Sequence, residues 1–176
     1  MSAPPSALDA LAQALRDRED VVDAVTFRTS DGTRTVAAVV PGPLASLADL
    51  RDQLWDTLPA EQLPDVLVAV SELPRDEDGA VATDRIEAEA VDQPGTYTFR
   101  PVESATEIAI AEVWREVLGR ARIGADDNFL DLGGDSMTAV LLLDRTNERL
   151  GTGLTLTDLL AAASLRELAA NIDATR

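Results

Sequence analysis

Cysteine, histidine and lysine are all absent from the 176 residues of the chain. Without cysteine there can be no disulfide, thiolate nucleophile or cysteine-type zinc site. Without histidine the chain lacks the usual general base near neutral pH and the commonest metal ligand. All 15 basic residues are arginine, so no lysine is available for Schiff-base chemistry. A chain this poor in catalytic groups is expected to carry or bind rather than to catalyse, and we expect no metal.

Aromatic residues and long apolar runs are also scarce. Aromatics make up 3% of a chain that is 45% hydrophobic, so the cores must be aliphatic. No run approaches the ~20 apolar residues of a membrane helix, and no basic-then-apolar segment opens the chain. We therefore expect a cytoplasmic protein. The net charge of −17 disfavours nucleic acid and anionic membrane and favours basic protein partners, although many of these acids are explained simply as solvated surface.

One short segment stands out near the middle of the second half. Residues 132–137 read Leu-Gly-Gly-Asp-Ser-Met and precede a long apolar-periodic run. This order puts the Ser136 hydroxyl at a helix N-terminus, where unpaired N–H groups and the helix dipole favour an attached anion such as a phosphodiester. Gly133 and Gly134 can take positive φ and allow close approach of a partner. On these six residues alone, an ordinary turn followed by a helix cap is at least as good an explanation.

The flanking sequence favours a specific site. A helix opened by Ser104 and Glu107 carries a buried stripe with Trp114, residues 123–129 read Ile-Gly-Ala-Asp-Asp-Asn-Phe, and another capped helix starts at Ser164. In order and spacing, residues 104–175 resemble the peptidyl carrier (thiolation) domains of nonribosomal peptide synthetases. The resemblance implies an all-α four-helix carrier-protein bundle with 4′-phosphopantetheine attached covalently to Ser136, within a motif that includes Gly134 and Asp135.

The function implied by this resemblance is tethering. A phosphopantetheinyl transferase would move the arm from coenzyme A to Ser136. The arm would then hold an aminoacyl or acyl group as a thioester during nonribosomal peptide, or hybrid peptide–polyketide, biosynthesis. The other expected partners are a trans-acting adenylation or loading enzyme and condensation, tailoring or thioesterase domains. The Ser136 hydroxyl would be an attachment point with no activating base of its own, which agrees with the lack of histidine.

The predicted helix over residues 136–150 has too many apolar residues for a single buried stripe. The resemblance implies that Met137 and Val140 are exposed and contact partner enzymes, while the leucines pack inward. The alternative is that all of these residues are core. The resemblance also implies partner recognition through acidic surface near the serine, which points to Asp131 and Asp135. Thr157 is expected to cap a short third helix of the bundle.

The first half of the chain predicts a small α+β domain. Leucines at helical spacing follow residue 8, and two strand-like runs flank the Asp-Gly turn at residues 31–32. A helix over residues 47–58 and a short apolar strand at 66–70 come next. This order predicts a small three-stranded sheet with two helices on one face. We expect this domain to span residues 1–90, a linker 91–103 and the carrier domain 104–176. Residues 97–99 of the linker alternate aromatic and threonine residues and are equally well explained as free linker or as a strand packed on a domain.

The first half resembles the C-terminal subdomain, or lid, of adenylation domains. In that family a Pro-x-x-Gly-Lys type motif follows the third strand, and its lysine contacts the substrate carboxylate and the adenylate. Here Gly79 is followed by Ala80 where the lysine belongs, and the acids at 76–78 would repel ATP phosphates. The family's hinge segment and large ATP-binding core are also missing. We therefore expect a degenerate, catalytically inert lid that docks partners or braces the carrier.

Two other functions stay open. The lid could complete a truncated adenylation core in trans, as half of a split enzyme. Alternatively, the chain could be an acidic docking protein that kept a carrier-like bundle without being modified.

Overall fold

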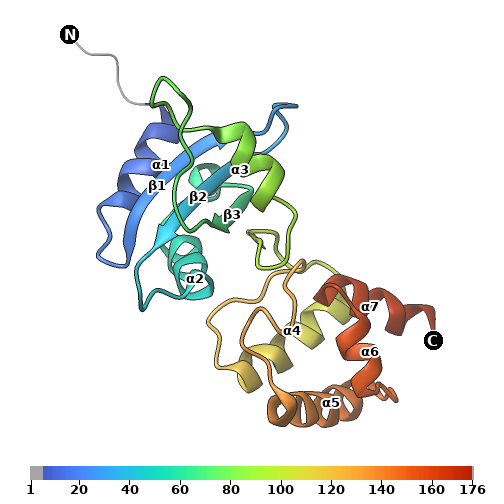
Figure 1. The fold of residues 1–176 in the computed structure, drawn as a ribbon. Coiled ribbons are helices and arrows are strands. Elements are labelled where there is room, and N and C mark those ends of the chain that lie inside the picture. The colour runs from blue at the N-terminus through green and yellow to red at the C-terminus, as the bar shows by residue number, and fades with distance from the viewer. Residues whose placement is uncertain (1–5, 176) are drawn as a thin grey trace. The chain divides into compact units, whose positions relative to one another are not determined.

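The computed structural model describes residues 6–175, and the chain divides into two compact units, residues 1–99 and 100–176 (Figure 1). Each unit has a core of its own. In residues 6–175, the helices are too short or too polar to cross a membrane. The boundary between the units falls between Phe99 and Arg100, so residues 91–99, predicted as part of the linker, lie in the first unit.

The first unit is built on a mixed four-stranded sheet in the order β1-β2-β3-β4. Strands β1 and β2 form the predicted hairpin, β3 joins β2 in parallel, and β4 pairs antiparallel with β3. The prediction of three strands is therefore wrong by one, because Tyr97 pairs with Leu67 and extends the sheet. The strands are β1 (Val21–Arg28), β2 (Thr35–Pro41), β3 (Val66–Ala69) and β4 (Tyr97–Thr98).

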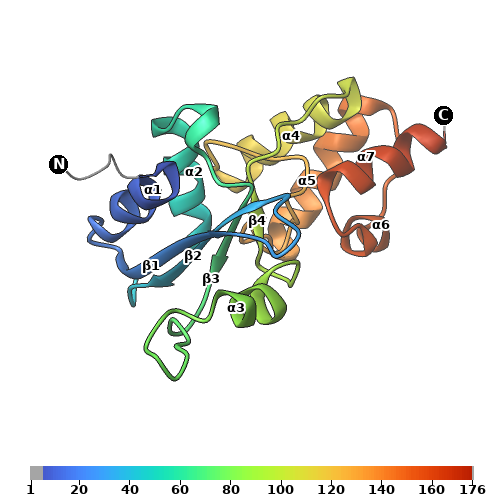
Figure 2. The same ribbon diagram turned by 90° about the horizontal axis from the view of Figure 1, so that it is seen from above.

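Helices cover both faces of this sheet, whereas two helices on one face were predicted. Helices α1 and α2 lie on one face and α3 on the other (Figure 2). The extra layer explains why residues 36–39 of β2 are all fully buried. Ile86 is the buried residue of α3 and packs on Val36 and Ala38. The helices are α1 (Ala7–Arg16), α2 (Leu47–Thr57) and α3 (Thr83–Ala90), with a 3-10 turn at Ala60–Gln62.

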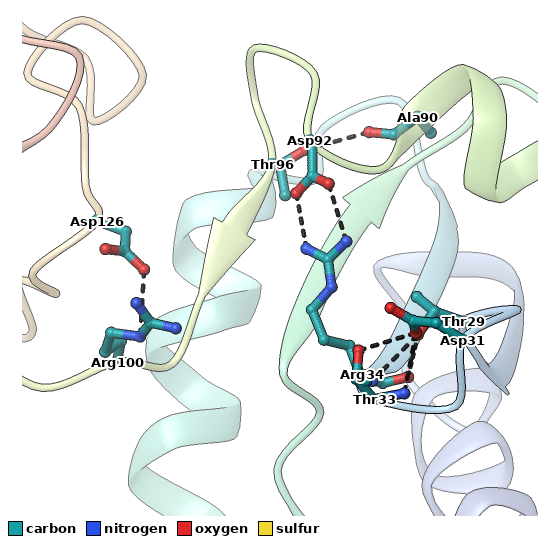
Figure 3. A network of polar contacts seen from close by, with 9 residues as sticks. All are labelled: Thr29, Asp31, Thr33, Arg34, Ala90, Asp92, Thr96, Arg100 and Asp126. Atoms are coloured by element: carbon teal, nitrogen blue, oxygen red, sulfur yellow. Dashed lines mark hydrogen bonds and ion pairs between the residues drawn. The ribbon is translucent and has the colours of Figure 1, made fainter.

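Polar contacts tie the segment after α3 to the hairpin of the first unit. The Arg34 guanidinium donates to both carboxylate oxygens of Asp92, at 2.7 and 2.8 Å (Figure 3). Asp92 is a non-glycine residue in the left-handed region, at φ 63°. The Thr96 hydroxyl donates to the carbonyl of Ala90 at 3.1 Å. These contacts hold the segment between α3 and β4, and β4 then pairs with the sheet.

The second unit is a four-helix bundle, as predicted. Helices α4 and α5 run antiparallel, since Glu112 pairs with Arg149 and Glu116 with Arg145. The sequence predicted the start of α5 at Ser136 and its end before Gly151, which takes φ 64°. The predicted cap of α6 was wrong, because Thr155 rather than Thr157 accepts the capping N–H. The helices are α4 (Ala105–Leu118), α5 (Ser136–Leu150), α6 (Leu156–Ala161) and α7 (Leu165–Ala174).

The core of the bundle forms around Trp114 of α4, which is 1% exposed. Its indole ring meets the ring of Phe129 edge to face, with centroids 6.0 Å apart. Aliphatic side chains from the other helices complete this core, as the composition predicted. The fully buried large aliphatic residues are Ile110, Leu142, Leu165, Leu168 and Ile172.

Candidate functional site

Ser136 is the first residue of α5 and its side chain is exposed. The preceding residue, Asp135, is the helix cap and has extended backbone, with φ −133° and ψ −178°. The chain therefore turns from extended to helical at the serine, which projects Ser136 from the start of the helix. Residues 132–137 thus place Ser136 at the N-terminus of a helix, as the sequence predicted, and the residue is exposed there.

Asp135 and Thr138 close the start of α5 with a reciprocal set of hydrogen bonds. The Thr138 N–H donates to the Asp135 carboxylate at 2.8 Å, and the Asp135 N–H donates to the Thr138 hydroxyl oxygen at 2.8 Å. That hydroxyl also lies 2.9 Å from the same carboxylate oxygen, to which it can donate. Hydrogen bonds from the Thr138 N–H and hydroxyl, and more weakly from the Met137 N–H, hold the pKa of Asp135 below its usual value.

This cap bears on one expectation about the helix N-terminus. Free N–H groups at the start of α5 were expected to favour a phosphodiester on the serine. In the structure, the carboxylate of Asp135 already accepts the Thr138 N–H. The side chain of Asp135 is thus one anion that the helix dipole stabilises at this end, and the phosphodiester on Ser136 stays a prediction.

Gly134 is fixed by the ring of Phe129. A Cβ added to Gly134 would lie 2.5 Å from two carbons of that ring, closer than real Cβ contacts come. Phe129 is 2% exposed and is held in turn by Trp114. The Gly134 N–H donates to the Phe129 carbonyl at 3.0 Å. Gly134 is therefore required by close packing, whereas Gly133 has open space but a φ of 89°, which favours glycine.

The loop that carries Phe129 is anchored to the start of α7. The Leu165 N–H donates to the Asp127 carbonyl at 2.8 Å and the Arg166 N–H to the Ala125 carbonyl at 2.9 Å. The buried Asp127 carboxylate accepts the Gly124 N–H at 2.7 Å. These bonds join the loop that carries Phe129 to the start of α7.

Ion pairs also connect this loop, α4 and α7. Arg166 lies 3.3 Å from Glu107 of α4 and 3.9 Å from Asp126 of the loop. Arg100 lies 3.6 Å from Asp126 (Figure 3). Burial raises the pKa of Glu107, but N–H groups of Glu103 and Ser104 and the Arg166 guanidinium outweigh it, so that the pKa is lowered.

Large apolar side chains are exposed next to Ser136. Met137 is 84% exposed and Val140 is 66% exposed. The expectation that the leucines of α5 pack inward is met by Leu142 but not by Leu141, which is 42% exposed. Asp131 is exposed in the preceding loop. Sequence reasoning missed three further exposed leucines in the loop and in α6, namely Leu130, Leu156 and Leu160.

Residues 75–81, where the sequence predicted a degenerate lid motif, form a tight exposed loop in the first unit. Arg75 and Val81 make an antiparallel bridge, and the Asp76 N–H donates to the Ala80 carbonyl at 2.8 Å. Gly79 takes φ 85°, and its carbonyl accepts from the Arg75 guanidinium at 2.9 Å. Ala80 thus stands on an exposed turn together with the three acids at 76–78.

Comparisons with known proteins bear on both units. A family model described as "Phosphopantetheine attachment site" matches residues 109–172. The chain is similar to a dimodular nonribosomal peptide synthase of Bacillus subtilis (strain 168), with 33% identity over 140 residues. That match covers 80% of this chain but 6% of the synthase, so the chain spans a small part of this relative.

Two solved structures are also similar. One is the phosphopantetheine transferase Sfp in complex with coenzyme A and a peptidyl carrier protein, at 32% identity and a TM-score of 0.42, covering 44% of this chain and 100% of the matched chain. The other is a four-domain nonribosomal peptide synthetase bound to AMP and glycine. It is 24% identical with a TM-score of 0.40, and the match covers 95% of this chain and 13% of that chain.

Proposed function

Residues 109–172 of this chain belong to the phosphopantetheine attachment family, as a peptidyl carrier (thiolation) domain of the nonribosomal peptide synthetase type, and we propose that Ser136 is the attachment residue. The observation that carries the assignment is a contrast between two serines. Residues 109–172 contain only Ser136 and Ser164. The Ser164 oxygen accepts the Glu167 N–H as the cap of α7, whereas Ser136 is exposed at the start of α5.

The proposed modification needs little from the chain itself. The Ser136 oxygen would form a bond to the pantetheine-side phosphorus of coenzyme A. The diphosphate P–O bond would break, releasing adenosine 3′,5′-bisphosphate, and the hydroxyl proton would pass to a base of the transferase. The chain has no histidine to supply such a base. Once attached, the group would supply a terminal thiol that holds an aminoacyl or acyl group as a thioester.

The geometry around Ser136 fits such a group. The residue is exposed, and the Gly133-Gly134 turn beside it has no Cβ. The ring of Phe129 supports that turn from within the bundle. A transferase and its bulky cosubstrate could therefore approach the hydroxyl.

Intact-protein mass after incubation with coenzyme A and a broad-specificity phosphopantetheinyl transferase tests the assignment. We expect one phosphopantetheine on the parent, none on Ser136→Ala and one on Ser164→Ala, the matched control. An unmodified parent that is well folded would remove the carrier function and leave the acidic docking protein. Modification of Ser136→Ala would place the attachment elsewhere.

For the first unit we propose a non-catalytic role in docking or bracing. The support is the loop at 75–81, where Ala80 stands in place of the lysine that the adenylation family uses and three acids precede it at 76–78. The alternative is the lid half of a split adenylation enzyme. ATP–pyrophosphate exchange with candidate adenylation cores decides between the two. We expect no exchange above the core alone, and an increase on adding this chain would favour the split enzyme.

We further propose that carrier partners contact Met137 and Val140, with Asp131 and Asp135 at the rim. The support is the high exposure of the two apolar side chains beside Ser136. Such partners would be the transferase, a trans-acting loading enzyme, and condensation, tailoring or thioesterase domains. Val140→Asp is expected to raise the KM of a partner enzyme for the carrier while the protein stays folded. An unchanged KM for each partner would argue against this surface.

A further inference from the structure

We propose that Thr138 is a positioning residue for Ser136, which fixes the residue before the serine in the geometry that modification requires. The inference rests on the proposed role of Ser136. The Gly134 N–H is bound to the Phe129 carbonyl at 3.0 Å, so the turn is attached to the bundle up to that point. Asp135 is the one residue between this attachment and the serine.

Thr138 holds both the backbone and the side chain of Asp135. Its hydroxyl oxygen accepts the Asp135 N–H at 2.8 Å, and its own N–H donates to the Asp135 carboxylate at 2.8 Å. The hydroxyl also lies 2.9 Å from that carboxylate oxygen and 3.1 Å from the Asp135 carbonyl. A single side chain one turn into the helix therefore orients the residue that precedes Ser136.

One consequence for the serine follows. Fixing the backbone of Asp135 fixes the direction in which Ser136 leaves the turn, and small errors of orientation are costly in group transfer.

The test uses the intact chain with the hydroxyl removed and restored. Thr138→Val keeps the shape of the side chain but loses the oxygen, Thr138→Ala loses the hydroxyl without β-branching, and Thr138→Ser restores it. Modification rates with coenzyme A and a phosphopantetheinyl transferase give kcat and KM. For Thr138→Val and Thr138→Ala we expect kcat to fall about tenfold with KM nearly unchanged. For Thr138→Ser we expect a kcat and a KM near those of the parent.

A matched control and a second readout separate positioning from stability. Ser104→Ala removes the cap of α4, whose oxygen accepts the Glu107 N–H at 3.0 Å, and should lower the melting temperature without changing kcat. In the unmodified chain, NMR titration of the Asp135 carboxyl should give a higher midpoint in Thr138→Val and Thr138→Ala than in the parent.

If the parent is not modified at all, the proposed function fails first. If the parent is modified and folded Thr138→Val and Thr138→Ala are modified at the parent kcat, Thr138 is only a helix cap and the inference is wrong. Equal losses in Thr138→Ser and Thr138→Val would also overturn it, because the hydroxyl would then not matter.

Discussion

At the scale of single residues, the close contact between Gly134 and Phe129 gives a direct prediction. Gly134→Ala would place a Cβ 2.5 Å from the Phe129 ring, which is buried and cannot move freely. We expect a loss of about 2 kcal/mol in the free energy of unfolding, typical of overpacking. Denaturant unfolding measures it. Gly153→Ala is the control, since its Cβ would meet nothing within 4 Å. Equal stabilities for the two variants would contradict the prediction.

Asp31 gives a prediction about pH. The Thr29 hydroxyl, and then the N–H and hydroxyl of Thr33, lower the pKa of Asp31 from 3.8 to about 2 (Figure 3). The folded pKa is below the unfolded one, so the stabilisation is fully present above pH 3.8 and is lost as the pH falls through about 2. The stability of Asp31→Asn should therefore depend less on pH between 4 and 2 than that of the parent. An NMR titration midpoint near 3.8 for Asp31 would refute this account.

The residues of the candidate site were predictable to different degrees. Ser136 and Gly134 are found by their motif, because glycines before a capped helix are a local pattern. Thr138 was missed, although an Asp cap followed three residues later by threonine is a variant of the capping box and is visible in the sequence. The exposure of Leu156 and Leu160 could not be predicted, because α6 has only six residues and shows no clear period.

At the scale of elements, a buried arginine joins α2 to β4. Arg51 is fully buried, lies 2.9 Å from Asp52 and has its guanidinium over the rings of Trp55 and Tyr97, at 5.3 and 5.6 Å. Phe99 packs edge to face on Trp55 at 5.7 Å. Three of the six aromatic residues of the chain thus hold β4 to the first unit. The arginine links the acid in α2 to the aromatic rings.

Removing this arginine is expected to be costly. In Arg51→Met the low-polarity site loses the charge beside Asp52 and the cation–π contacts, and we expect the first unit to lose about 3 kcal/mol of stability. Chemical denaturation followed by tryptophan fluorescence measures it. Arg85→Met is the control, because its ion pair with Glu89 is exposed and is worth about 0.5 kcal/mol or less. A loss for Arg51→Met as small as that of the control would mean that the cluster does not hold the unit together.

The strand that this cluster holds was the least predictable element. β4 has two residues and pairs with β3 some thirty positions earlier. Such a short strand forms because it pairs with β3, and not because its own residues favour extended structure. From the sequence, residues 97–99 were equally well explained as a strand or as free linker. The pairing of Tyr97 with Leu67 shows that a strand forms there. Likewise α3 contains one buried residue, Ile86, so no apolar period marked it as a helix that covers a sheet.

At the scale of the whole molecule, each unit buries its own core. The bundle around Trp114 draws its core residues from helices α4 to α7 and from the loop with Phe129. We therefore expect a fragment of residues 100–176 to fold alone, and to be modified by a phosphopantetheinyl transferase at a rate similar to that of the full chain. Circular dichroism and intact mass measure the two properties. A fragment that is unfolded would show that the bundle depends on residues before Arg100.

The charge of the molecule leads to a further expectation. With 32 acidic against 15 basic residues, the chain should associate faster with basic partners, and this acceleration should weaken as salt screens it. The association rate with the transferase, measured from low to physiological ionic strength, tests this. A rate that does not change with salt would indicate that docking depends on apolar contacts alone.

The exposure of Met137 makes its side chain accessible to oxidants. Met137 is 84% exposed, and the only other methionine in the chain is Met1. A mild oxidant would convert its thioether to a sulfoxide, which is polar, chiral and reversible by reductases. The residue next to Ser136 would then change from apolar to polar without any change in the fold. At the proposed partner surface, this oxidation would weaken binding, and treatment with a methionine sulfoxide reductase would restore it.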